Sequence, residues 1–247
     1  MPLEIASFTT SSALLSLTAT PLPSRIELCQ DSSVGGLTPT LESYITIKST
    51  AASLHVPVHI MIRPHARSFA YDAGDLEQMK ESIERFNELG CEGFVLGCLV
   101  QHEEGFKVDR HACKALLDVI GKNRKVTFHR AFDQVSVIHM AEQLEVLVEL
   151  GFDGLLTSGG AKSAVEGNDM LRMLVEKARG RIEIIVGGGV RSTNLKELRS
   201  AIGEDVKWWH SSAVTGSREE ANIVEVEALG VIITSGDGED DDELTKH

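Results

Sequence analysis

The 247-residue sequence is short of aromatic residues, of basic side chains and of long apolar runs. Aromatic residues make up 5% of it, and 24 lysines and arginines stand against 37 aspartates and glutamates, for a formal net charge of −13. A surface with this negative excess repels polyanions, so we predict that nucleic acid is not a partner. No apolar run approaches the roughly 20 residues that cross a bilayer, and the N-terminus lacks the basic start of a secretory signal. We therefore predict no membrane partner.

Cysteine is also scarce, and the motifs of several enzyme classes are missing. The four cysteines, Cys29, Cys91, Cys98 and Cys113, form no CxxC pair and no dense framework, which predicts free thiols in a reducing compartment. The sequence has no Walker loop, dinucleotide fingerprint, HExxH motif or serine elbow, and no residue cluster with zinc spacing. These absences leave no familiar reaction to assign from motifs.

What the sequence does have is an alternation of short apolar segments with longer segments of helical period. Such alternation is typical of βα units around a parallel sheet, and the length suits one undivided α/β barrel. We predict a (β/α)₈ TIM-type barrel as a single domain over residues 1–234. Its eight strands are expected at Leu3–Ala6, Arg25–Cys29, Val58–Arg63, Gly93–Cys98, Lys125–His129, Gly154–Thr157, Glu183–Val186 and Lys207–His210.

Two of the intervening helices have a clear apolar stripe, whereas the last has none. Apolar residues recur at three and four residues over 76–86 and again over 140–151. The segment 223–234 ends in Val-Ile-Ile-Thr, which favours an extended backbone, so we expect the eighth helix to be irregular or incomplete. The acidic block 237–243 predicts a disordered tail over residues 235–247.

Polar residues gather where the predicted strands end, which is the face that handles ligands in such barrels. Because side chains alternate along a strand, Glu4, Glu27, Arg63 and His129 are expected to point into the lumen. Buried charges are costly unless paired, so we expect an ion pair between Glu27 and Arg63. Two interpretations stay open for Glu27, Arg63 and His129, a structural network or candidate catalytic groups.

A second group of residues suits an anion. Arg63, Arg67 and Arg130 predict a cationic mouth beside His129. Gly188 and Gly189 follow the seventh strand and Ser211 follows the eighth, where barrels often bind phosphate; a tight turn that needs glycine is the alternative. We name Arg63, Arg130, Gly188, Gly189 and Ser211 as candidate anion-binding residues.

Seven blocks of the sequence resemble the CutC family of copper homeostasis proteins, in the same order and over residues 3 to about 213. They are Arg25-Ile-Glu-Leu-Cys29, Gly35-Gly-Leu-Thr-Pro39, Ile62-Arg-Pro64 with Phe69-x-Tyr71, Thr127-Phe-His-Arg-Ala-Phe-Asp133, Leu156-Thr-Ser-Gly159, Gly187-Gly-Gly-Val190 and His210-Ser-Ser212. The resemblance implies a TIM-like barrel, a role in copper tolerance or trafficking, and a cytoplasmic location, with the nucleus as an alternative in eukaryotes. It implies no established reaction.

The resemblance also implies a Cu(I) site made by two cysteines, one on each of the first two strands. Cys29 matches the second of these positions, but Ala6 stands at the first. Inward residues at the same height on adjacent strands lie about 5 Å apart, so we expect positions 6 and 29 to face each other. Met61 and Cys98 are soft donors that could replace the missing thiolate, and plain core packing is the alternative for both.

Three functions therefore compete at this point. The first is a copper-binding protein of the CutC type, with Cys29 as the metal ligand. The alternative is an enzyme acting on a small anionic or phosphorylated substrate, with Arg63 and Arg130 as the clamp and His129 or Glu27 as acid or base. The third is an interaction scaffold. A second copy of the chain is a further candidate partner.

Overall fold

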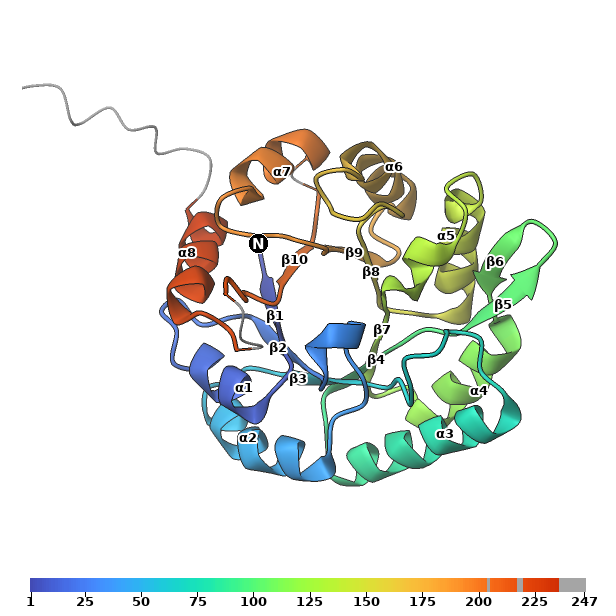
Figure 1. The fold of residues 1–247 in the computed structure, drawn as a ribbon, viewed down its shortest axis with the longest axis horizontal. Coiled ribbons are helices and arrows are strands. Elements are labelled where there is room, and N and C mark those ends of the chain that lie inside the picture. The colour runs from blue at the N-terminus through green and yellow to red at the C-terminus, as the bar shows by residue number, and fades with distance from the viewer. Residues whose placement is uncertain (204, 217–219, 236–247) are drawn as a thin grey trace, which may run out of the picture.

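A computed structural model describes residues 1–203, 205–216 and 220–235 and contains a closed barrel of eight parallel strands (Figure 1). Neighbouring strands in the barrel follow chain order, and the first strand pairs with the last, as predicted for a TIM-type barrel. The barrel strands are β1 (Leu3–Ser7), β2 (Arg25–Leu28), β3 (Val58–Met61), β4 (Gly93–Leu96), β7 (Lys125–Phe128), β8 (Gly154–Thr157), β9 (Glu183–Val186) and β10 (Trp208–Ser211). Each overlaps one of the eight predicted strands.

Helices surround the barrel on its outside (Figure 1). They are α1 (Thr10–Ser16), α2 (Leu41–Ser53), α3 (Ala73–Glu88), α4 (Arg110–Ile120), α5 (Met140–Leu150), α6 (Asn168–Ala178), α7 (Leu195–Ile202) and α8 (Ile223–Thr234), with 3₁₀ turns η1 (Ser32–Val34) and η2 (Arg130–Gln134). The two predicted stripes are confirmed, because α3 buries Met79, Ile83 and Phe86 and α5 buries Met140, Leu144 and Leu147.

The main core lies between the strands and the helices. It takes alternate strand residues such as Ile5 on β1 and Ile26 and Leu28 on β2, all of which have no measurable exposure. The intervening residues, among them Glu4 and Glu27, are equally buried but face the lumen. The predicted separation of inward and outward residues on these two strands is confirmed, and it delivers charged side chains to the barrel interior.

A two-stranded antiparallel hairpin, β5 (Leu99–His102) and β6 (Gly105–Val108), interrupts the βα pattern after β4 and was not predicted. It projects beyond the helix ring beside α5 (Figure 1). The backbone N–H of Val108 donates to Oε1 of the buried Gln143 on α5 at 2.9 Å, which anchors the base of the hairpin.

The eighth helix is regular, so the prediction of an irregular or incomplete one is wrong. α8 begins after Asn222, whose side-chain oxygen accepts a hydrogen bond from the N–H of Val224 at 3.0 Å, and it runs to Thr234. Its buried residues recur with helical spacing at 225, 226, 229, 230 and 233. The periodicity is hidden in the sequence because Val224 and Val231 are apolar but 69% and 53% exposed.

The remaining whole-chain predictions have mixed outcomes. All four cysteines are free, as predicted. No helix in the described ranges is long and apolar enough to cross a membrane. The predicted acidic tail lies outside the described residues apart from residue 235. The exclusion of nucleic acid and the association with a second copy stay predictions.

Candidate functional site

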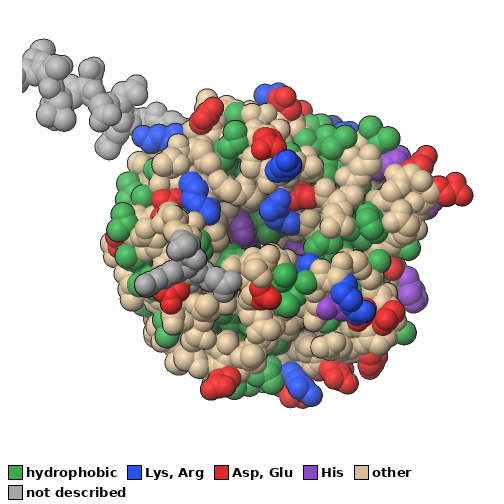
Figure 2. All heavy atoms as spheres, viewed as in Figure 1, with side chains coloured by type: hydrophobic (Ala, Val, Ile, Leu, Met, Phe, Trp, Pro, Cys, Tyr) green, Lys and Arg blue, Asp and Glu red, His purple; other side chains and the backbone are tan. Residues whose placement is uncertain are grey.

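A small cavity of about 70 Å³ opens at the carboxyl ends of the barrel strands. Figure 2 shows this face of the molecule hollowed near its centre, with histidine side chains inside the hollow and basic side chains around it. Three residues that we predicted for the lumen, Glu27, Arg63 and His129, line the cavity together. The full lining is Ala6, Phe8, Glu27, Gly35, Met61, Arg63, Phe69, His129, Arg130, Ala131, Leu156 and His210.

A network of four charged or titratable residues occupies the lumen on the side of β1, β2 and β10. Arg25 Nε donates to Glu4 Oε2, and Arg25 also stacks 4.0 Å from the centre of the Trp208 ring. His210 Nδ1 lies 2.7 Å from Glu4 Oε1 and 3.9 Å from Glu27 Oε2. Within the described residues, no ion pair joins Glu27 to Arg63, so that predicted pair is wrong.

The electrostatics of this network separate its two carboxylates. Burial opposes ionisation of Glu4, but Arg25 and the hydrogen bond from His210 outweigh it and hold the pKa of Glu4 well below its usual range. No hydrogen-bond donor among the described residues contacts Oε2 of Glu27, and burial together with the charge of Glu4 raises the pKa of Glu27 to about 7. Burial opposes protonation of His210, yet its hydrogen bond to Glu4 and the two carboxylate charges raise its pKa.

Arg63 forms hydrogen bonds with the loop after β2 and not with the expected carboxylate of Glu27. Its Nη1 donates to the carbonyl oxygens of Val34 at 2.7 Å and of Gly36 at 3.1 Å, and its guanidinium stacks 4.5 Å from the centre of the Phe69 ring. Carbonyl oxygens and an aromatic face thus take the place of the carboxylate expected as the partner of Arg63, and among the described residues its Nε has no hydrogen-bond partner. Arg67 was expected beside it, but Arg67 is 70% exposed and pairs with Asp75 outside the cavity.

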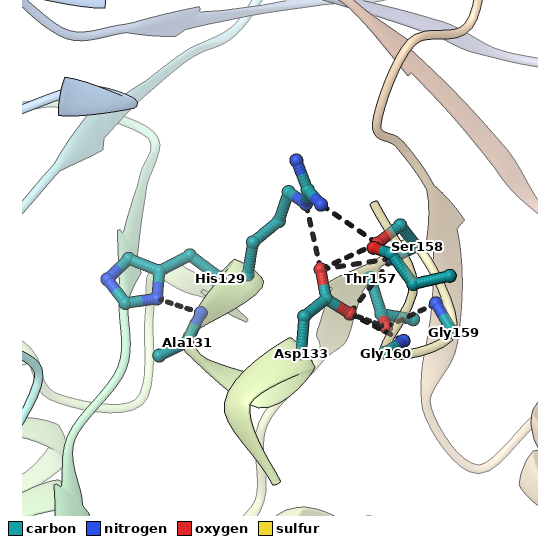
Figure 3. Close-up of polar contacts among 9 residues, drawn as sticks. His129, Ala131, Asp133, Thr157, Ser158, Gly159 and Gly160 are labelled. Atoms are coloured by element: carbon teal, nitrogen blue, oxygen red, sulfur yellow. Dashed lines mark hydrogen bonds and ion pairs between the residues drawn. The ribbon is translucent and has the colours of Figure 1, made fainter. Parts of the chain in front are cut away.

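His129 is held as a neutral imidazole. Burial and the nearby charge of Arg63 lower its pKa to about 3. Its Nδ1 accepts a hydrogen bond from the N–H of Ala131 at 3.2 Å (Figure 3), so the proton of the neutral ring is on Nε2. That N–H has no hydrogen-bond partner among the described residues. Catalytic roles for Glu27, Arg63 and His129 stay predictions.

The guanidinium of Arg130 forms hydrogen bonds with Asp133 and with Ser158, the residue that follows β8. Its Nε donates to Asp133 at 2.8 Å and its Nη2 donates to Ser158 Oγ at 2.8 Å, while Asp133 also accepts the backbone N–H groups of Ser158 and Gly160. A Cβ at Gly188 would lie 2.9 Å from Ser158 Cβ and 3.3 Å from Arg130 Cζ, in a backbone with φ +98°. Position 188 requires glycine because these side chains leave no room for a Cβ and because φ is positive.

The predicted anion-binding residues divide between the cavity lining and the turns next to it. Arg63 and Arg130 line the cavity, whereas Gly188, Gly189 and Ser211 are not part of its described lining. The hydroxyl of Ser211 donates to the carbonyl of Val190 at 2.7 Å and accepts from Arg191 Nη1 at 3.1 Å. Anion binding by these residues stays a prediction, and the hydrogen bonds favour the alternative of a tightly packed turn.

The candidate metal ligand Cys29 lies in a small apolar cluster with Met61 and Val95, separate from the main core. A Cβ built at Gly36 would lie 3.3 Å from Cys29 Cβ and 3.4 Å from Met61 Cε, so both sulfur side chains pack against the same glycine. Burial and the carboxylates of Glu27 and Glu4 raise the pKa of the Cys29 thiol.

Cys98, the other soft donor that could replace the missing thiolate, does not pack with Cys29. Cys98 belongs to the main core outside the barrel, where Cys113 Sγ lies 3.9 Å from its carbonyl oxygen. It lies two residues after β4, whose Phe94 and Leu96 face the main core while Val95 packs with Cys29. Met61 is therefore the soft donor that the fold brings to Cys29.

The strand register also corrects the expected geometry of positions 6 and 29. Ala6 pairs with Glu27, and the N–H of Cys29 donates to the carbonyl of Ser7 at 3.0 Å. Cys29 is the next inward residue after Glu27, the register partner of Ala6. Ala6 and Cys29 are therefore diagonal neighbours on the two strands. The expectation of equal height was wrong because the two strands are staggered, which sequence alternation does not encode.

Three residues of this region escaped sequence reasoning, namely Arg25, Arg191 and His210. Arg25 and His210 could have been found from the same alternation, because Arg25 shares its face with Glu27 and Cys29 on β2 and His210 lies next to the outward Trp209 on β10. Arg191 follows β9 and bonds both Ser211 and Ser212 with its guanidinium. No local sequence signal marks that contact.

Comparisons with known proteins agree with the barrel and with the resemblance to the CutC family. The sequence profile of the CutC family matches residues 4–215. A CutC family protein of Xanthomonas campestris is 38% identical over 213 residues, which are 86% of this chain and 83% of that protein. The human copper homeostasis protein cutC homolog is 40% identical over 179 residues, 72% of this chain and 62% of that protein.

Solved structures give the same result. The putative copper homeostasis protein CutC of Streptococcus agalactiae superposes with a TM-score of 0.76 and 32% identity, over 87% of this chain and all of that one. A thiamine phosphate pyrophosphorylase of Pyrococcus furiosus, 16% identical with a TM-score of 0.61, shares the fold alone. With its profile match, its curated relatives and this structure in agreement, the chain belongs to the CutC family.

Proposed function

We propose that this protein handles copper as cargo and binds Cu(I) at the barrel lumen through Cys29 and Met61. The descriptions of the human and streptococcal relatives as copper homeostasis proteins support the copper role. The observation that carries the ligand assignment is the shared packing of Cys29 and Met61 against Gly36, beside the cavity.

The chemistry of the two donors fits the ion. A thiolate and a thioether are soft ligands that select Cu(I) over harder cations. Glu27 and Glu4 disfavour a bare thiolate at Cys29, and the same negative charges stabilise a cation that displaces the thiol proton. With Ala6 in place of a second cysteine, one thiolate holds the ion, which weakens binding and suits transfer. A reduced thiol also favours the cytoplasm as the proposed compartment.

A Cu(I) competition titration with a chromophoric chelator tests the assignment. Cys29→Ser removes the thiolate and is expected to lower the affinity at least tenfold, about 1.4 kcal/mol, while Met61→Leu keeps the packing and lowers it less. Cys113→Ser is the matched control, because Cys113 is an equally buried free thiol in the outer core. Equal affinity in wild type and Cys29→Ser, or an equal loss in Cys113→Ser, would contradict the proposal.

A further inference from the structure

The geometry points to a second metal site, in which Glu4, Glu27 and His210 bind a divalent first-row cation and share no ligand with the Cu(I) site at Cys29 and Met61. One ligand atom from each of the three residues lies within 4.8 Å of the other two. His210 Nδ1 is 2.7 Å from Glu4 Oε1 and 3.9 Å from Glu27 Oε2. Metal bonds of about 2.0–2.2 Å need ligand atoms roughly 3–3.5 Å apart, so small side-chain shifts complete the site.

An unpartnered oxygen shows where the cation would sit. Glu27 is 2% exposed, and its Oε2 has no hydrogen-bond partner among the described residues. A buried carboxylate oxygen without a donor is costly, and His210 Nδ1, the facing nitrogen at 3.9 Å, is too far away to form a hydrogen bond with it. A bound cation between Glu27, His210 and Glu4 would satisfy it directly.

The surroundings of the three residues resemble the supporting shell of a metal site. Arg25 Nε donates to Oε2 of Glu4, which leaves Oε1 on the His210 side, and the Trp208 ring fixes the guanidinium. Metal-binding carboxylates commonly have such a second partner. Binding displaces the protons of Glu27 and His210, and the two carboxylates, the neutral imidazole and the one guanidinium then carry a net charge of −1, which attracts a dication in spite of Arg25.

The donor set separates this site from the copper site. One imidazole nitrogen and two carboxylate oxygens suit borderline or hard dications such as Zn²⁺ and Mn²⁺, whereas Cys29 and Met61 suit Cu(I). Glu27 and His210 also line the cavity, so an ion held by three protein atoms keeps one side toward it. Sites with three protein ligands and an open position are typical of metals that bind a further small ligand.

Calorimetric titration of the full chain with Zn²⁺ tests the inference, in a Cys29→Ser background that removes the soft ligand. We expect one Zn²⁺ per chain in this background and at least a tenfold loss of affinity when Glu27→Gln is added. Glu27→Gln is isosteric at an oxygen without a hydrogen-bond partner, so the fold is expected to persist, and His210→Asn is the second variant. Glu225→Gln is the matched control, since Glu225 is a buried carboxylate on α8 that bonds Ser192 outside the lumen.

Anomalous diffraction from crystals grown with Zn²⁺ locates the ion. A peak bound by Glu4, Glu27 and His210 supports the site. Absence of Zn²⁺ binding in the Cys29→Ser background, unchanged affinity in Glu27→Gln, or a peak elsewhere overturns it. If wild type binds Zn²⁺ only through Cys29, this inference fails while the Cu(I) proposal stands.

Discussion

A single side chain, that of residue 6, sets the character of the proposed copper site. Ala6 lines the cavity and pairs in register with Glu27, so its methyl group stands diagonally from Cys29. The lumen there offers sulfur from Cys29 and Met61 and oxygen from Glu27. One larger, softer side chain at position 6 would therefore reach the space next to both sulfur atoms.

We expect Ala6→Cys to raise Cu(I) affinity at least tenfold, because a second thiolate replaces a weaker thioether contact. The competition titration described for Cys29→Ser measures the gain. Ala70→Cys adds a thiol at an exposed position and serves as the control. Equal affinity in the two variants would show that position 6 cannot reach the ion bound by Cys29.

At the scale of single elements, helix α8 is held in place by polar contacts at its start as well as by its buried apolar residues. Its sequence is apolar on both faces, and the start of the helix is set by the side chain of Asn222. The same side chain donates from Nδ2 to Thr215 Oγ1 at 2.8 Å, and Glu225 on the first turn accepts the N–H and hydroxyl of Ser192. These polar contacts dock the helix beside β1 and α7.

Asn222→Ala is expected to destabilise the protein by about 1 kcal/mol, the usual cost of removing an N-cap. Urea unfolding followed by circular dichroism measures the difference. Val224→Ala is the control, because Val224 is 69% exposed in the same turn and its loss is expected to matter little. A larger effect from Val224→Ala would mean that the exposed apolar face of α8 is covered.

Taken as a whole, the molecule keeps several titratable groups uncharged inside the barrel. Burial raises the pKa of Glu27 to about 7, and burial lowers the pKa values of His59 and His129 to about 3. Their effects on stability oppose each other. The pKa values of Glu4, His59 and His129 are lowered by folding, so the folded protein loses stability as pH falls and these groups are protonated. The pKa of Glu27 is raised by folding, so the folded protein loses stability as pH rises from about 4.5 to 7.

The variant Glu27→Gln isolates the contribution of Glu27. Between about pH 4.5 and 7 the folded protein retains a proton on Glu27 that the unfolded chain releases, so wild type loses stability with rising pH. The variant is expected to gain stability relative to wild type across this window, by roughly 3 kcal/mol at most. Urea unfolding of both proteins at pH 5, 6, 7 and 8 measures the difference, and a constant difference would contradict the raised pKa.

Local patterns in the sequence were enough for the barrel and for much of its lumen. Period-two alternation on β1 and β2 placed Glu4 and Glu27 inside and Ile5 and Ile26 outside, because a pleated strand alternates its side chains whatever surrounds it. The stripes of α3 and α5 were predicted for the same reason. The helix α8 was not, since its apolar exposed face carries no such contrast.

The sequence by itself determined which side chains enter the barrel, because that depends on each strand alone. The tertiary structure decided which of them meet. The stagger between β1 and β2 set Ala6 beside Glu27 instead of Cys29, and barrel closure brought His210 from β10 to Glu4. Partner choice depends on the relative shift of separate strands and on loops such as the one that Arg63 holds, and no single segment encodes either.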